Sequence, residues 1–147
     1  MKVKEAMTGD VTLVNPDQTI REAAQMMIEI DAGALPVAEN DHLVGMITDR
    51  DIAVRGVALG KAPNTKVREI MSGEVLYCFD DEELTHVSRN MSDMKVRRLP
   101  VVNRDKRLVG IVSLADLATE GSLPRTAQAL HGISQPSGQH NQSPARA

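Results

Sequence analysis

The chain has 147 residues, enough for one domain or for two small half-domains that share a core. Its formal net charge of −3 argues against nonspecific binding to nucleic acid, and with one Tyr, one Phe and no Trp it has almost no rings on which bases could stack. The single cysteine excludes an intrachain disulfide and fits a reducing compartment. Because the N-terminus has no apolar signal region and no segment approaches transmembrane length, we expect a cytoplasmic protein without a membrane partner.

The first half alternates between strand-like and helix-like periodicity. The predicted elements are a short strand at 11–14, a helix at 20–30, strands around 35–38 and 43–47, and a last helix that starts at Thr48. Thr19 is a suitable start for the helix at 20–30, and Gly33 is a suitable stop. Asn40 and Asp41 indicate the turn between the two longer strands.

The second half repeats the first. Residues 3–8 return as 67–72, Leu35-Pro36-Val37 returns as Leu99-Pro100-Val101, and 43–51 returns as 108–116 with one residue inserted. The corresponding elements are a strand at 75–78, a helix at 84–94, strands at 99–102 and 108–112 with a turn at Arg104-Asp105, and a helix from Ser113. We therefore predict an α/β (α+β) fold of two β-α-β-β-α units that pack about a pseudo-twofold axis.

Composition places the boundaries between these units. We predict a first repeat at 1–60, a linker at 61–66 and a second repeat at 67–120. In the remaining region, 121–147, a helix from Pro124 to Ile133 could dock through Leu123, Ala127, Leu130 and Ile133. Beyond Gln135 the composition is typical of a disordered tail.

Each repeat carries a hydroxyl residue three places before an aspartate, Thr48 with Asp51 and Ser113 with Asp116. This spacing is that of a helix N-cap, and the same groups could also contact a ligand, so both interpretations stay open. No catalytic site is indicated. The histidines, His42, His86, His131 and His140, are far apart and lack metal-ligand spacing, and Cys78 lies in a predicted strand as an inert small hydrophobe.

The repeat resembles a pair of cystathionine-β-synthase (CBS) domains, the unit that pairs into a Bateman module. The residues that carry this resemblance are 34–37 with 45–52 and 97–102 with 110–117, and it covers about residues 3–120. More narrowly, the segment from Thr48 to Thr65 is similar to small stand-alone bacterial modules of the hypoxic-response type, which implies a stress-response role.

The resemblance implies two clefts between the repeats that take adenine nucleotides, with the aspartate on the ribose and the hydroxyl residue on a phosphate. One cleft would use Thr48 and Asp51 and face Leu76, Arg97 and Arg98. The other would use Ser113 and Asp116 and face Thr12, Gly33 and Ala34, which offer no cation. We therefore expect a charged nucleotide in the Asp51 cleft, and either no ligand or a neutral adenosine moiety in the Asp116 cleft.

The resemblance thus implies a non-catalytic sensor that needs no cofactor and binds AMP, ADP, ATP or S-adenosylmethionine as a regulatory ligand. It also implies a disc-like homodimer through the helical faces at 20–30 and 84–94, and a downstream protein partner that the sequence does not name. The alternative is a ligand-free scaffold for dimerisation or protein–protein interaction. An enzyme is not supported, because no nucleophile–base pair or metal constellation is present.

Overall fold

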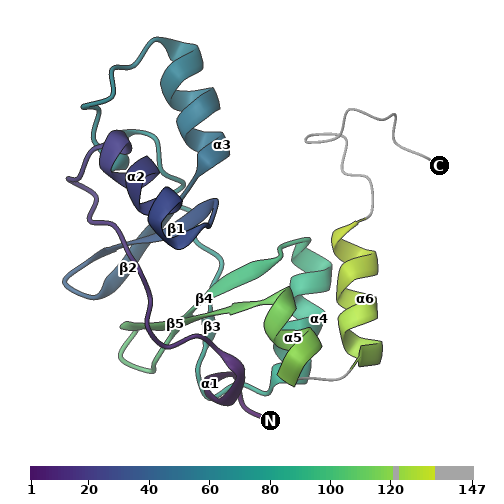
Figure 1. The fold of residues 1–147 in the computed structure, drawn as a ribbon. Coiled ribbons are helices and arrows are strands. Elements are labelled where there is room, and N and C mark those ends of the chain that lie inside the picture. The colour runs from purple at the N-terminus through teal and green to yellow at the C-terminus, as the bar shows by residue number, and fades with distance from the viewer. Residues whose placement is uncertain (121–122, 135–147) are drawn as a thin grey trace.

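A computed structural model describes residues 1–120 and 123–134, and Figure 1 shows two small sheets, each with its own helices. In one sheet β1 and β2 pair antiparallel, and the order in the other is β3-β4-β5. The elements are α1 (Val3–Ala6), α2 (Ile20–Ile30), β1 (Ala34–Glu39), β2 (His42–Thr48), α3 (Asp49–Asp51), η1 (Ile52–Gly56), η2 (Val57–Leu59), η3 (Val67–Glu69), β3 (Cys78–Phe79), α4 (Leu84–Met94), β4 (Arg98–Val102), β5 (Leu108–Ser113), α5 (Leu114–Glu120) and α6 (Leu123–Ile133). This duplicated mixture of strands and helices confirms the predicted fold class.

The two hairpins agree with the predicted strands, but the short strand ahead of each helix is smaller than predicted. Of the run 11–14 only Val14 pairs, through one parallel bridge to β1. Pro16 follows two residues later and has no N–H with which a ladder could continue. In the second repeat, the run 75–78 pairs only through Cys78, which begins β3.

α2 begins and ends at the predicted residues, Ile20 and Ile30, but the residue that terminates it differs from the predicted one. Thr19 and Glu22 form a reciprocal capping box, in which the Glu22 N–H donates to Thr19 Oγ1 at 3.1 Å and the Thr19 N–H donates to Glu22 Oε1 at 3.4 Å. The helix ends at Asp31, which adopts a left-handed conformation at φ 53°, so Gly33 is not the stop. Aspartate tolerates this conformation better than most residues, because its short polar side chain can bond locally.

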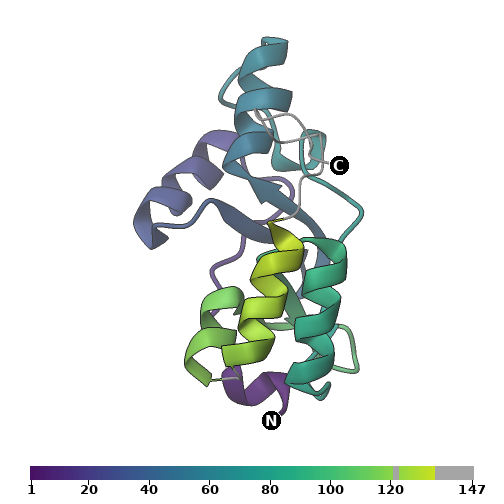
Figure 2. The same ribbon diagram turned by 90° about the vertical axis from the view of Figure 1, so that its right-hand side faces the viewer.

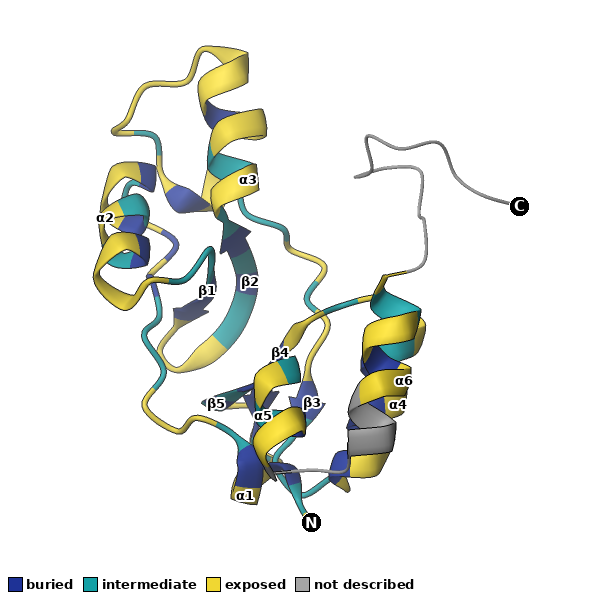
Figure 3. Cartoon of the chain, turned by 45° about the vertical axis from the view of Figure 1, so that its right-hand side comes forward, coloured by how far each residue is buried: buried dark blue, intermediate teal, exposed yellow. Residues whose placement is uncertain are grey.

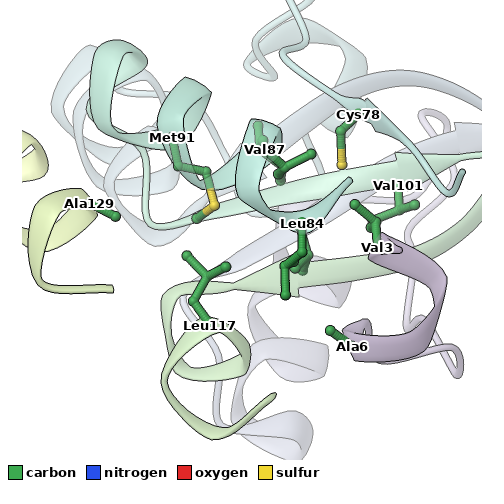
Figure 4. Packing of buried hydrophobic residues seen from close by; sticks show 11 residues of the cluster. Val3, Ala6, Cys78, Leu84, Val87, Met91, Val101, Leu117 and Ala129 are labelled. Carbon is green, nitrogen blue, oxygen red and sulfur yellow. The ribbon is translucent and has the colours of Figure 1, made fainter. Parts of the chain in front are cut away.

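Each repeat completes its core with the N-terminal segment of the other. Val3 and Ala6 of α1 lie in the core of the second repeat, among residues such as Leu84, as Figure 4 shows. Conversely, Val67 and Ile70, at and after η3, lie in the core of the first repeat. Because the segments cross over, neither repeat has a complete core by itself.

Backbone pairing reinforces this exchange. Thr8 forms an antiparallel bridge with Ile111 of β5, and Ser72 forms the equivalent bridge with Met46 of β2. Each bridge consists of two backbone hydrogen bonds, with N···O distances of 2.9 and 3.0 Å. The two repeats are therefore joined by backbone pairing that a single repeat cannot make.

The C-terminal helix is present, but its contact face differs from the predicted one. α6 confirms the helix expected at 124–133 and packs against α4 and α5. Its buried residue is Ala129, whereas Ala127 and Leu130 are exposed. At Gly132 a Cβ atom would overlap Ser92 Oγ of α4 and lie 2.9 Å from the Ser92 carbonyl oxygen, so small residues decide which face docks. The side chain of Leu123 and the predicted tail beyond Gln135 lie outside the described residues.

Candidate functional site

Both hydroxyl–acid pairs cap the helices that follow them. The Asp51 N–H donates to Thr48 Oγ1 and the Thr48 N–H donates to Asp51 Oδ2, each at 3.0 Å. In the second repeat the Ser113 N–H donates to Asp116 Oδ2 at 2.8 Å, and the Ser113 hydroxyl donates to the same oxygen at 3.0 Å. The capping interpretation is thus confirmed. It uses one oxygen of each carboxylate and leaves the other oxygen for a further interaction.

The second of these pairs opens into a cavity of about 410 Å³ between the repeats. Ser113, Asp116 and Ile111 come from the second repeat together with Arg98, and the remaining walls come from the first repeat, at 8–12 and 30–34. Of the predicted ligand-binding residues, the structure brings together Thr12, Ala34, Arg98, Ser113 and Asp116. A molecule bound here would touch both repeats.

The structure places Arg98 on the wall of the Ser113–Asp116 cavity, whereas the prediction from the sequence assigns it to the Asp51 cleft. Arg98 and Ser113 are directly paired across the β4–β5 hairpin, so the guanidinium group lines the cavity of its own repeat. The same register in the first repeat pairs Ala34 with Thr48. Since an antiparallel hairpin places the first residue of one strand opposite the last residue of the next, the cation belongs with Ser113 and Asp116.

The other predicted residues do not join this cavity. Thr48, Asp51, Leu76 and Arg97 line neither of the two cavities described here, and Leu76 is 47% exposed. The Asp51 Oδ1 atom lies 4.0 Å from Nε of Arg55, one turn further along the same helical segment. Gly33 lies in a separate groove beside α2, and its carbonyl oxygen accepts a hydrogen bond from the Asp49 N–H at 2.9 Å.

Two acidic residues of the cavity were missed by sequence reasoning. Asp10 and Asp31 line it together with Asp116, so three carboxylates face one guanidinium group, that of Arg98. Asp10 stands in an irregular segment, and Asp31 enters the wall only because α2 ends at that residue. No periodicity or motif indicates these positions. The acidic excess favours a ligand that carries positive charge or little net negative charge.

Clusters of metal-binding side chains and the single cysteine would be further candidate sites. Within residues 1–120 and 123–134, no group of three or more His, Cys, Asp or Glu side chains could hold a metal ion. Cys78 is buried in the core, and desolvation, with smaller effects of Glu82 and Asp80, raises the pKa of its thiol to about 12. A thiol in this state is not a nucleophile at neutral pH. Of the described helices, none has the length and hydropathy needed to traverse a bilayer.

The comparison with known sequences supports one family. The model of the CBS domain matches residues 3–56 and 67–122. The chain is 47% identical over 116 residues to the CBS domain-containing protein YhcV of Bacillus subtilis, which covers 79% of this chain and 82% of YhcV. It is 40% identical over 117 residues to Hypoxic response protein 1 of Mycobacterium tuberculosis, which covers 78% of this chain and 81% of that protein.

Solved structures agree with this result. Hypoxic Response Protein I, crystallised with two coordinated zinc ions, has a TM-score of 0.75 at 38% identity, over 83% of this chain and 100% of that one. The CBS domain pair of MJ0100, in complex with 5′-methylthioadenosine and S-adenosyl-L-methionine, has a TM-score of 0.70 at 31% identity, over 80% of this chain and 93% of that one. CBSX2 in complex with AMP has a TM-score of 0.71 at 26% identity, over 80% of this chain and 93% of that one.

Proposed function

This chain belongs to the CBS-domain family, and on that premise we propose that it is a non-catalytic regulatory module for an adenosyl ligand. The proposed site is the cavity that contains Ser113, Asp116 and Arg98. The observation that carries the proposal is the pairing of Arg98 with Ser113, which puts a cation and a hydroxyl group beside a carboxylate in a space that both repeats line. The adenosyl ligands of MJ0100 and CBSX2 support the ligand class.

The residues of the cavity match the parts of such a ligand. The Asp116 carboxylate accepts hydrogen bonds from a ribose diol, and the Arg98 guanidinium group donates to a phosphate or carboxylate group. Val11, Ile30 and Ile111 supply aliphatic surface for the base. In the first repeat, Ala34 stands at the position equivalent to Arg98. We therefore assign a ligand that carries a phosphate or carboxylate group to the Asp116 cavity and not to the Thr48–Asp51 position.

A bound ligand can regulate the chain because residues of both repeats line the cavity. A ligand in this cavity stabilises the relative arrangement of the repeats that it fits best, by as much as its affinity differs between arrangements. We include in the proposal a homodimer and a downstream protein partner that would respond to that arrangement. The similarity to Hypoxic response protein 1 supports a place in a stress response.

The second candidate function is a ligand-free scaffold for protein association. It is favoured by the acidic residues of the cavity, because Asp10, Asp31 and Asp116 would repel an anionic nucleotide. The capping bonds of Asp51 and Asp116 also give both aspartates a structural role without any ligand.

Titration calorimetry with AMP, ATP and S-adenosylmethionine separates the two functions. Asp116→Ala and Asp51→Ala form a matched pair, because each removes one capping acid, at a cost of about 1 kcal/mol of stability. We expect binding to the wild-type chain that is lost in Asp116→Ala and in Arg98→Ala and is kept in Asp51→Ala.

Two results would contradict the proposed site. Loss of binding in Asp51→Ala alone would move the site to the first repeat. No heat and no thermal shift with any of the three ligands would favour the scaffold, since a ligand at 100 times its Kd stabilises the fold by about 2.7 kcal/mol.

A further inference from the structure

Three charged side chains of the Asp116 cavity have no partner within the described part of the chain. Asp10, Asp31 and Arg98 line the cavity, and none of them takes part in an ion pair or a side-chain hydrogen bond among residues 1–120 and 123–134. All three residues are exposed, and Figure 3 shows the exposed last turn of α2, which Asp31 follows. Their charges are therefore available to a molecule that enters the cavity.

The two repeats carry opposite charges at the position of Asp31. Asp31 ends α2 in the left-handed conformation at φ 53°, and Lys95 ends α4 in the same conformation at φ 57°. The offset of 64 residues that aligns 3–8 with 67–72 also aligns these two positions. The C-terminal end of a helix favours a base and disfavours an acid, because the helix dipole is negative there. The backbone therefore does not require the acid at position 31, and a positive group in the cavity would compensate its cost.

Asp10 adds a second acid from a different element. It lies in the segment between α1 and α2, which crosses from the second repeat to the first, as Figure 2 shows. Asp10 and Asp31 line the cavity in addition to Asp116, whose carboxylate is assigned to the ribose. These two acids outnumber Arg98, so the part of the cavity that is not used by the ribose carries excess negative charge.

We propose that Asp10 and Asp31 are specificity-determining residues, which favour an adenosyl ligand with a cationic group on its ribose 5′ substituent over an anionic nucleotide. The inference rests on the proposed function, because it names the class of adenosyl ligand for the same cavity. The positive group is attracted by the two acids, and a carboxylate on the same substituent accepts hydrogen bonds from Arg98. In AMP and ATP the 5′ substituent is entirely anionic, so Arg98 attracts it and both acids repel it.

S-adenosylmethionine has the charges that this arrangement requires. Its 5′ substituent carries a sulfonium group, an ammonium group and a carboxylate, whereas S-adenosylhomocysteine lacks the sulfonium charge. We expect calorimetry on the full chain to give affinities that fall from S-adenosylmethionine to S-adenosylhomocysteine to AMP. The first should bind at least about tenfold more tightly than AMP, since one hydrogen bond to a charged group accounts for a change of this size.

Asp31→Lys reverses the charge with the residue that the second repeat carries at the equivalent position. It should weaken the binding of S-adenosylmethionine at least about tenfold and strengthen the binding of AMP. Without ligand, thermal unfolding of this variant should occur at no lower temperature than that of the wild type, because lysine is favourable at a helix C-terminus. Asp10→Asn, which removes one charge and keeps the size, should change both affinities in the same directions.

Asp41→Lys is the matched control. Asp41 is also left-handed, at φ 66°, and its counterpart in the second hairpin is Lys106 at φ 61°. The substitution makes the same change in net charge, but Asp41 does not line the cavity, and its exposed ion pair with Arg107 contributes little to stability. Asp41→Lys should therefore leave both affinities unchanged.

The outcomes separate this selectivity from the proposed function. AMP that binds the wild type at least as tightly as S-adenosylmethionine would overturn the selectivity and leave the adenosyl site in place. Equal effects of Asp31→Lys and Asp41→Lys would show a general effect of net charge and would overturn the role of Asp31. A wild-type chain that binds no member of the series would overturn the proposed function itself.

Discussion

At the scale of single residues, Arg104 contacts both an acid and an aromatic ring. Its guanidinium group donates two hydrogen bonds to Asp81, from Nε at 2.8 Å and from Nη2 at 2.7 Å, and lies 4.1 Å from the centre of the Phe79 ring. Phe79 in turn meets Tyr77 edge-on, with the ring centres 5.7 Å apart. The single Tyr and the single Phe of the chain thus contact each other at β3, and the Phe79 ring also contacts the Arg104 cation.

This pairing predicts a loss of stability in acid. The hydrogen bonds from Arg104, followed by its charge, hold the pKa of Asp81 below its ordinary value of 3.8. The folded state therefore binds fewer protons than the unfolded state near this pH, so the stabilisation is complete above 3.8 and is lost as the pH falls below it. In urea unfolding, the difference between the wild type and Asp81→Asn should be constant above about pH 5 and should shrink below the ordinary pKa.

Asp105→Asn is the control for this measurement. Asp105 lies in the same turn as Arg104 and forms no ion pair among the described residues. A stability difference for Asp81→Asn that stays constant down to pH 2 would contradict the assigned cause.

At the scale of elements, the helix starts follow local chemistry and the helix contacts do not. Thr19, Thr48 and Ser113 all precede an acid by three residues, and all three form the hydrogen bonds that this spacing predicts. The contact face of α6 follows another rule. Apolar spacing favours Ala127 and Leu130, but the helix packs through Ala129 and Gly132, because only small residues allow the close approach to Ser92.

Gly132→Ala should therefore destabilise the protein, although the same change in an open helix stabilises it by about 1 kcal/mol. The new methyl group would meet the Ser92 side chain and its carbonyl oxygen, and overpacking of this kind costs about 1 to 3 kcal/mol. Chemical denaturation measures the change. The exposed Ala127, replaced by Ser, is the control, and an increase in stability for Gly132→Ala would show that α6 does not lie against α4.

At the scale of the whole molecule, the exchange of N-terminal segments unites the two repeats. Val3 is fully buried in the second core, and its counterpart Val67 is fully buried in the first. A change in the N-terminal segment of one repeat therefore acts first on the core of the other repeat.

Val3→Ala and Val67→Ala form a matched pair that tests this exchange. Each removes two buried methyl groups and leaves a small cavity, at a cost of about 2 kcal/mol. By hydrogen exchange, Val3→Ala should first expose the amides of α4 and β5, which are far from residue 3 in sequence, and Val67→Ala those of α2 and β2. Loss of protection in the repeat that is nearest in sequence would contradict the crossed arrangement.

The sequence by itself determined the duplication, the hairpins, the helix starts at Thr19, Thr48 and Ser113, and the CBS-type fold. The hairpins and the helix starts depend on periodicity, turn residues and capping within a few positions, whereas the CBS-type fold was indicated by the resemblance of the repeated segments to CBS-domain pairs. It also placed Ser113 and Asp116 in one predicted cleft, and both residues line the same cavity.

Only the tertiary structure decided which residues share a cavity and which surfaces remain open. Arg98 joins Asp116 because of the β4–β5 register, Asp10 and Asp31 join them from the other repeat, and α6 packs against α4 and α5, whereas the groove beside α2 stays open. The physical reason is that these contacts depend on packing between segments far apart in the chain, where size and close approach outweigh local pattern.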